Sequence, residues 1–170
     1  AITLPRGTMS VPLVVQATFN NGNTSIVNAA NGVQFASNRA EVTVDGTQAI
    51  VVSNTAPVGQ IARVTATFQG FQDFIDVTVS AATLQSLTAS PSAINLPYGG
   101  FSTTIVVTGN FSDGSTAQVS YANLNFSGPM TRYTLNTSTG VLTTNAVMNP
   151  PAGGTETLSV AHATLAVPPA

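Results

Sequence analysis

The sequence contains no cysteine, no tryptophan and no lysine, and it has few charged residues of any kind. Aspartate, glutamate and arginine together make up 6% of its 170 residues, against about 25% for charged residues in ordinary globular proteins. The absence of cysteine excludes disulfide bonds and thiolate metal sites. No apolar run approaches the roughly 20 residues that a membrane-spanning helix needs, so we expect no membrane insertion.

The small amount of charge limits the partners of the chain. Four arginines (Arg6, Arg39, Arg63 and Arg132) face six acidic residues, and the net charge is −2. Four positive charges in a chain of net negative charge cannot neutralise a run of nucleic-acid phosphates, so we expect no nucleic-acid partner. Ser, Thr, Asn, Gln and Gly must cover most of the surface. Such a surface suits a protein outside the cell, or one packed against its own copies, where charges would have to be desolvated.

Short runs of β-branched and aromatic residues dominate the sequence. In one run, Val64, Ala66 and Phe68 alternate with threonines, as expected for a half-buried strand. Dipeptides such as Asn21-Gly22 separate the runs and indicate hairpin turns. This spacing predicts an all-β sandwich. The predicted strands are Leu13–Phe19, Ala49–Ser53, Ala62–Phe68, Phe71–Ser80, Leu84–Ser90, Ile94–Leu96, Thr103–Phe111, Gly140–Thr144 and Thr155–His162.

The first 28 residues reappear, without a gap, as residues 93–120. The two segments, AITLPRGTMSVPLVVQATFNNGNTSIVN and AINLPYGGFSTTIVVTGNFSDGSTAQVS, share twelve identical positions at a shift of 92 residues. A repeat of this length suits a small domain that folds alone better than a solenoid unit. We therefore expect two domains, residues 1–82 and residues 83–170.

Several segments occur in the same order in both copies. In the second copy they are LTASPSAINLPYGG, VVTGNFSDGST, LNFSG, STGVLTT and GGTETLSVAHA; in the first they are LPRGT, VVQATFNNGNTS, VQFAS, VDGTQAIVV and GQIARVTATFQG. This order resembles the bacterial Ig-like domains of group 2, the tandem units of intimin- and invasin-type surface adhesins. The resemblance covers most of the chain. It implies two tandem immunoglobulin-like β-sandwich domains, extracellular or at the cell surface, that serve as spacer, stalk or adhesive module without catalytic residues or cofactors.

Aromatic residues on the predicted strands are the expected anchors of the two cores. The family resemblance places Phe35 and Phe126 at the centre of each sandwich, where relatives often carry tryptophan. The full set of expected core residues is Val14, Phe19, Phe35, Val64, Ala66 and Phe68 in the first copy, and Ile105, Val107, Phe111, Phe126, Leu158 and Val160 in the second.

The two copies differ at opposite ends. The first begins at Ala1 without a counterpart of LQSLTASPS, so we expect its first strand to be missing. The second continues after Val160 as AHATLAVPPA, where the first has a hairpin and a long strand, so its last strand is expected to be missing or swapped. The closing LAVPPA resembles LTASPS, the lead-in of the second copy.

These ends lead to two competing hypotheses. In the first, Leu165, Ala166 and Val167 act as a donor strand that adds to an open edge at Ile2 and Leu4 of another subunit. Repeated head to tail, this contact builds a homo-oligomer or filament. In the second, the sequence is a mature form or an excised piece of a longer array, or the second copy simply ends differently. A ligand- or glycan-binding adhesive module, with a host or glycan ligand, and an accessory domain of a larger secreted or virion protein remain alternative functions.

Residues able to support catalysis or metal binding are scarce. His162 is the only histidine, and no Asp or Ser stands near it in a catalytic pattern. Asp73 and Asp76 lie three apart on one predicted strand and should point to opposite faces, which is wrong for a shared metal. Asp45 and Asp113 each precede glycine, which favours a hairpin turn over a calcium loop. We therefore expect no enzyme activity, no cofactor and no metal site.

Overall fold

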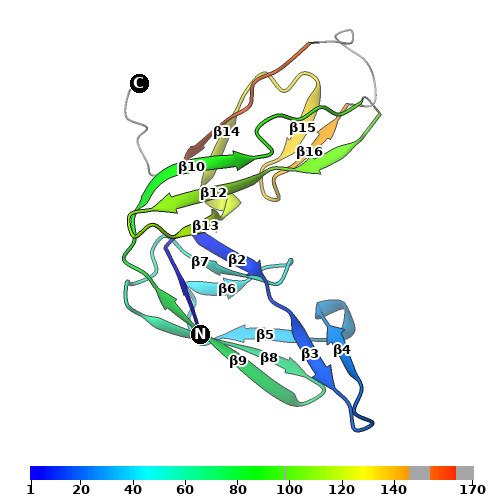
Figure 1. The fold of residues 1–170 in the computed structure, drawn as a ribbon, viewed down its shortest axis with the longest axis vertical. Helices are drawn as coiled ribbons and strands as arrows, with labels where there is room; N and C mark the ends of the chain where they lie inside the picture. Colours follow the sequence, from blue (N-terminus) through cyan, green and yellow to red (C-terminus); the bar gives the residue numbers. More distant parts are fainter. Residues whose placement is uncertain (98, 146–153, 164–170) are drawn as a thin grey trace. The chain divides into compact units, whose positions relative to one another are not determined.

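A computed structural model of the chain describes residues 1–97, 99–145 and 154–163. These residues form strands, turns and two three-residue 3₁₀ helices, so the fold is all-β with several sheets. The chain divides into two compact units, Ala1–Thr83 and Leu84–Ala170 (Figure 1).

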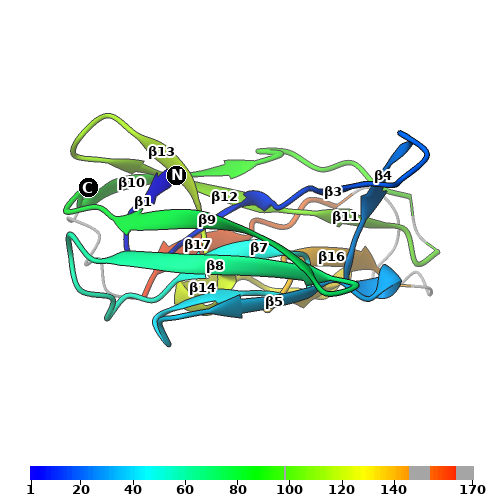
Figure 2. The same ribbon diagram turned by 90° about the horizontal axis from the view of Figure 1, so that it is seen from below.

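The first unit contains two larger sheets and a separate hairpin. Figure 2 shows β8 and β9 side by side; β5 lies on the other side of β8, and β1 pairs in parallel with β9. The first sheet has the order β1 (Ile2–Leu4), β9 (Phe71–Val79), β8 (Ile61–Phe68) and β5 (Gln34–Ser37). The second joins β2 (Thr8–Pro12), β7 (Ala49–Val52) and β6 (Val42–Val44); β3 (Val15–Thr18) and β4 (Thr24–Val27) form the hairpin, and η1 spans Ala29–Asn31.

Both larger sheets of the first unit contribute to one hydrophobic core. Val42, Ile50 and Val52 come from the β2–β7–β6 sheet, and Val64 and Val77 from the other. All five are at most 1% exposed. The two sheets of the first unit therefore share one hydrophobic core. The remaining cluster members are Leu4, Ala56, Ala62 and Val79, with Ile2, Leu13, Phe35, Val44 and Ile75 packed partly buried against them.

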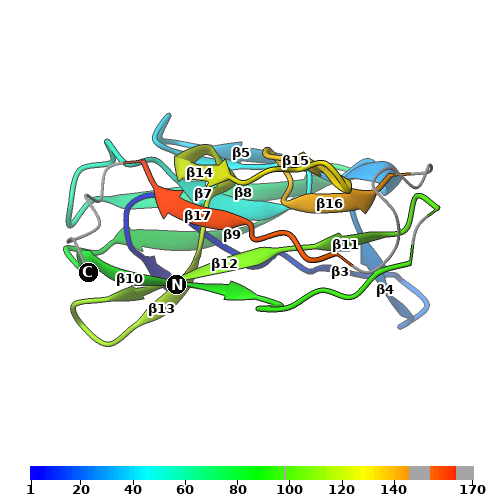
Figure 3. The same cartoon turned by 90° about the horizontal axis from the view of Figure 1, so that it is seen from above.

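The second unit repeats several of these pairings. Figure 3 shows β14 beside β17 and β15 beside β16. Its strands are β10 (Leu84–Ser90), β12 (Val106–Phe111) and β13 (Thr116–Val119) in one sheet; β11 (Ser102–Thr104), β16 (Val141–Thr144) and β15 (Tyr133–Asn136) in another; and β14 (Leu124–Ser127) with β17 (Ser159–His162), while η2 spans Tyr121–Asn123. Its core consists of Ile105, Val107, Val119, Leu124, Tyr133 and Leu142, with Phe126, Leu158 and Val160 partly buried against it.

The structure corrects two of the expected core residues. Val14 is 73% exposed and Phe19 is 40% exposed. Val14 and Phe19 flank β3, which is paired only with β4 in the described part of the unit. Leu13 packs against the core instead of Val14. Phe68 is half-buried outside the main cluster, whereas Phe111 is buried.

The predicted strand Thr103–Phe111 is interrupted at Ile105, and the predicted strand Leu13–Phe19 begins at the equivalent break of the first unit, between β2 and β3. Leu13 donates its N–H to the carbonyl of Gln48 at 2.9 Å, between β2 and β3. Ile105 donates its N–H to the carbonyl of Gly140 at 2.8 Å, between β11 and β12. Each break allows the chain to pair with one strand before it and with a different strand after it. The alternation of apolar and polar residues in the sequence does not reveal such a break.

The predicted strand Ile94–Leu96 is absent from the structure. Its counterpart in the first unit is β1, which forms by pairing with β9. The described part of the second unit contains no strand equivalent to β9, so Ile94–Leu96 has no partner there. Of the segment predicted over Thr155–His162, only Ser159–His162 is a strand.

Candidate functional site

One of the two acidic residues of β9, Asp76, takes part in a surface contact of the first unit. Asp76 lies opposite Arg63, while Asp73 lies opposite Ala66. The Asp76 carboxylate accepts two hydrogen bonds from the Arg63 guanidinium, at 2.8 and 3.0 Å. These hydrogen bonds lower the pKa of Asp76. The guanidinium also stacks on the ring of Phe74, 3.7 Å from its centroid, so this cluster ties β8 to β9.

The two aspartates before glycine hold turns together. Asp45 Oδ1 accepts the N–H and the hydroxyl of Thr47, at 2.8 and 2.7 Å. Asp113 Oδ1 accepts the N–H and the hydroxyl of Ser115, and these bonds lower the pKa of Asp113. Such local bonds are typical of Asx turns. Within residues 1–97, 99–145 and 154–163, no three His, Asp or Glu side chains gather to hold a metal ion.

Glu156 fixes a loop of the second unit. Its carboxylate accepts the backbone N–H of Thr131 at 3.1 Å and that of Arg132 at 3.4 Å, as well as the hydroxyl of Thr131. The hydrogen bond from the Thr131 side chain is the main reason that the pKa of Glu156 is lowered. The Arg132 Nε lies 3.9 Å from the same carboxylate. These contacts connect the segment before β15 with the segment before β17.

His162 lies in β17, and burial lowers its pKa below the ordinary value. Because the folded state favours the neutral ring, the resulting stability is present above the unfolded pKa of about 6.5 and is lost as the pH falls below it. We expect the melting temperature of the second unit to fall between about pH 7.5 and about pH 5.5. A His162→Gln variant should give a flatter profile in calorimetry; the same slope for both proteins would contradict a role of His162.

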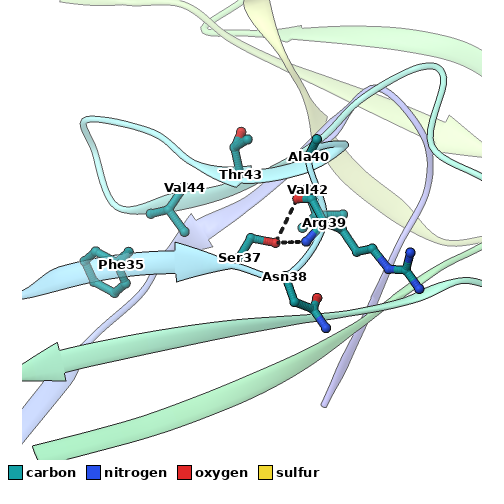
Figure 4. A pocket seen from close by; sticks show the side chains of 8 residues that line it. All are labelled: Phe35, Ser37, Asn38, Arg39, Ala40, Val42, Thr43 and Val44. Atoms are coloured by element: carbon teal, nitrogen blue, oxygen red, sulfur yellow. Dashed lines mark hydrogen bonds between the residues drawn. The ribbon is translucent and has the colours of Figure 1, made fainter.

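A shallow hollow of about 450 Å³ lies beside β5 and β6 in the first unit. Figure 4 shows its lining, in which Ser37 and Arg39 hydrogen-bond to each other through the Ser37 hydroxyl. Arg39 is the single charged residue of this lining, and no carboxylate, histidine or aromatic pair faces it. The hollow therefore lacks the convergent groups of a catalytic site.

In the described residues, none of the helices has the length and apolar character to cross a membrane.

The unequal pairing of equivalent strands is the most distinctive feature of the two units. In the second unit, β12 lies between β10 and β13. The repeat aligns β12 with β3 at a shift of 92 residues. In the first unit, β3 pairs with β4, the equivalent of β13, and the described residues supply no equivalent of β10. An unpaired strand edge exposes backbone N–H and C=O groups that can pair with another strand.

The structure places the predicted assembly residues as follows. Ile2 and Leu4 lie in β1, opposite Val77 and Val79 of β9. Leu4 is buried and belongs to the core of the first unit, so β1 is an integral edge strand of its sheet. The donor residues Leu165, Ala166 and Val167 lie outside the described residues. Sequence reasoning missed β3 as an edge, which the pairing of β3 with β4 alone identifies among the described residues.

Comparisons with known proteins show no family for this chain and give similarity only to solved structures. No family model matches the chain, and no curated protein matches it. Among solved structures, the chain is similar to domains 4 and 5 of the S-layer protein SbsC, with 19% identity, a TM-score of 0.34, and coverage of 88% of this chain and 74% of the other. A second SbsC structure, rSbsC(31-844), gives 17% identity and a TM-score of 0.35 over 95% of this chain, which spans 27% of that protein.

Proposed function

We propose that this chain is a non-enzymatic structural subunit of an extracellular filament or adhesin stalk. In this proposal, its units are two tandem Ig-like domains of the bacterial group 2 type, and copies assemble head to tail by β-strand addition. The observation that carries the proposal is the lead-in strand β10, which pairs with β12 in the second unit and has no described counterpart beside β3. The strand equivalent to β9 is likewise absent from the described second unit.

The small number of charged surface residues supports a role in self-assembly over a role in catalysis. With 6% charged residues, contacts between subunits desolvate few charges, which removes a common penalty of association. Four carboxylates already form contacts within the chain. Those of Asp45 and Asp113 bind within turns, that of Asp76 forms an ion pair, and that of Glu156 holds a loop. Their arrangement holds the backbone and offers no nucleophile with a positioned base.

Deleting Thr164–Ala170 should abolish assembly if the tail is the donor strand. Each added strand contributes backbone hydrogen bonds and side-chain burial at a subunit contact, and the deletion removes all of these. We expect sedimentation and negative-stain microscopy to show polymers of the full chain and monomers of the truncated one. A control with the tail sequence scrambled, which keeps length and composition, should also fail to assemble. Polymers formed equally by the truncated chain would contradict the proposal.

A second candidate function is a ligand- or glycan-binding adhesive module. It is favoured by Phe71 and Phe74 of β9, which are exposed on the first unit. Exposed aromatic rings are a common feature of binding surfaces. The test is a glycan array, followed by an NMR titration of the full-length chain with any glycan that binds. A monomeric chain whose Phe74 resonances shift in this titration would favour this function over the filament subunit.

A further inference from the structure

We infer that the acceptor for strand addition is the outer edge of β3, residues Val15–Thr18, and that its occupant is Thr164–Val167 of a second copy of this chain. This inference rests on the proposed function and assigns the contact a strand, a direction and a register. It also moves the acceptor from β1, where sequence reasoning put it, to a different edge of the same unit.

The second unit provides the template for the contact. There β10 runs antiparallel to β12, with Leu87 opposite Gly109, Thr88 opposite Thr108 and Ala89 opposite Val107. Leu87 and Ala89 face inward and pack against the core of that unit. The strand β10 therefore completes both the backbone pairing of β12 and the side of the core beneath it.

The repeat transfers this register to the first unit. Aligning LAVPPA with LTASPS and shifting β12 by 92 residues puts Leu165 opposite Ala17, Ala166 opposite Gln16, and Val167 opposite Val15. Leu165 and Val167 then take the inward positions of Leu87 and Ala89. Alternation along β3 agrees, because Val15 and Ala17 are half-buried whereas Gln16 is exposed.

The exposure of equivalent residues marks the vacant side. Phe111 in the second unit is 5% exposed, and its counterpart Phe19 in the first is 40% exposed. In the second unit, the side chains of Phe111 and of Leu84 from β10 both lie against the position where Gly109 would carry a Cβ atom. A lead-in strand thus helps to cover this aromatic ring, and the first unit has the ring without such a strand among its described residues.

A difference between the copies suits a short donor. The first unit has Ala17 where the second has Gly109, and a Cβ atom at Gly109 would overlap the Leu84 side chain. The methyl group of Ala17 therefore fills part of the space that Leu84 takes in the second unit. A donor that starts after the Leu84 position, as Thr164–Val167 does in this alignment, avoids that overlap and ends before Phe19, whose ring it leaves uncovered.

The apolar surface around β3 also favours burial by another subunit. Val11, Val14 and Ile26 are all more than half exposed in and around β2, β3 and β4. Gln16 and Ile26 lie opposite each other on the outward face of the hairpin. No charged residue occurs in β3, in β4 or in the segment 164–167, so an added strand meets no charge that must be desolvated.

Disulfide trapping between full-length chains tests this register. The chain has no native cysteine, so an introduced pair reports only its own contact. Directly opposed residues of antiparallel strands have Cα atoms about 4.5–5.5 Å apart, within the range of a disulfide. On oxidation, chains carrying Gln16→Cys and Ala166→Cys should give a ladder of covalent polymers on a non-reducing gel. Thr24→Cys on β4, paired with Ala166→Cys, is the matched control and should remain monomeric on the gel.

A competing pair separates this inference from the proposed function. Thr3→Cys with Ala166→Cys reports addition at β1, the acceptor first expected. A ladder from the Gln16 pair and none from the Thr3 pair supports β3 as acceptor. A ladder from the Thr3 pair alone overturns the inference and leaves the filament proposal standing. Monomers in microscopy, with no ladder from either pair, overturn both.

Discussion

An Ile50→Ala substitution is expected to lower the free energy of unfolding of the first unit by about 2–5 kcal/mol. Ile50 is fully buried in β7 and belongs to the cluster shared by the two larger sheets. Truncation removes three carbon atoms from a site enclosed by both sheets, which limits collapse around the cavity. This would be a large part of the stability of a domain of this size. Chemical denaturation followed by circular dichroism measures it.

Two matched variants make the Ile50 result specific. Ile61→Ala removes the same atoms from a side chain that is 57% exposed, so its effect should stay within about 0.5 kcal/mol. Leu142→Ala truncates the equivalent core position of the second unit, since Leu135–Leu142 repeats the pairing of Val44–Ile50. It should destabilise the second unit alone. Equal effects of Ile50→Ala and Ile61→Ala would contradict the core assignment.

The sequence predicts the turns and much of the core of both units. Alternation correctly places Val64 and Val107 inside, because each lies in a strand with neighbours that cover one face. Asn21-Gly22 and Asp113-Gly114 each close a hairpin, with glycine at positive φ. These features depend on residues close in sequence, where local geometry decides the outcome.

Residues whose burial depends on a distant strand are the ones that sequence reasoning misplaced. Val14 and Phe19 have the apolar character of core residues, yet both are exposed at the ends of β3, which pairs only with β4 among the described residues. Ile94–Leu96 matches Ile2–Leu4 in sequence but lacks a partner like β9 in the described part of its unit. Comparison of the copies reveals that the ends differ, but only the pairing pattern identifies β3 as the edge.

A Gly140→Ala substitution is expected to destabilise the second unit by about 2–5 kcal/mol, through two separate effects. Gly140 has φ of 69°, a left-handed conformation that costs a side-chain-bearing residue about 1–2 kcal/mol. A Cβ atom there would also lie 2.6 Å from the Ile105 carbonyl oxygen and from Cζ of Tyr121. The Tyr121 hydroxyl donates a 2.7 Å hydrogen bond to that same carbonyl, so the added methyl group must displace a packed ring and break this bond.

Gly114→Ala separates the conformational effect from the steric one. Gly114 has φ of 80°, but a Cβ atom at this position meets nothing within 4 Å. Its substitution should therefore cost only the conformational part, about 1–2 kcal/mol, as measured by the same denaturation experiment. Combining Gly140→Ala with Tyr121→Ala should give less than the sum of the two single effects, because the ring that the methyl group displaces is already gone. Strict additivity, or equal effects of Gly114→Ala and Gly140→Ala, would mean that the close packing of Tyr121 over Gly140 contributes nothing to stability.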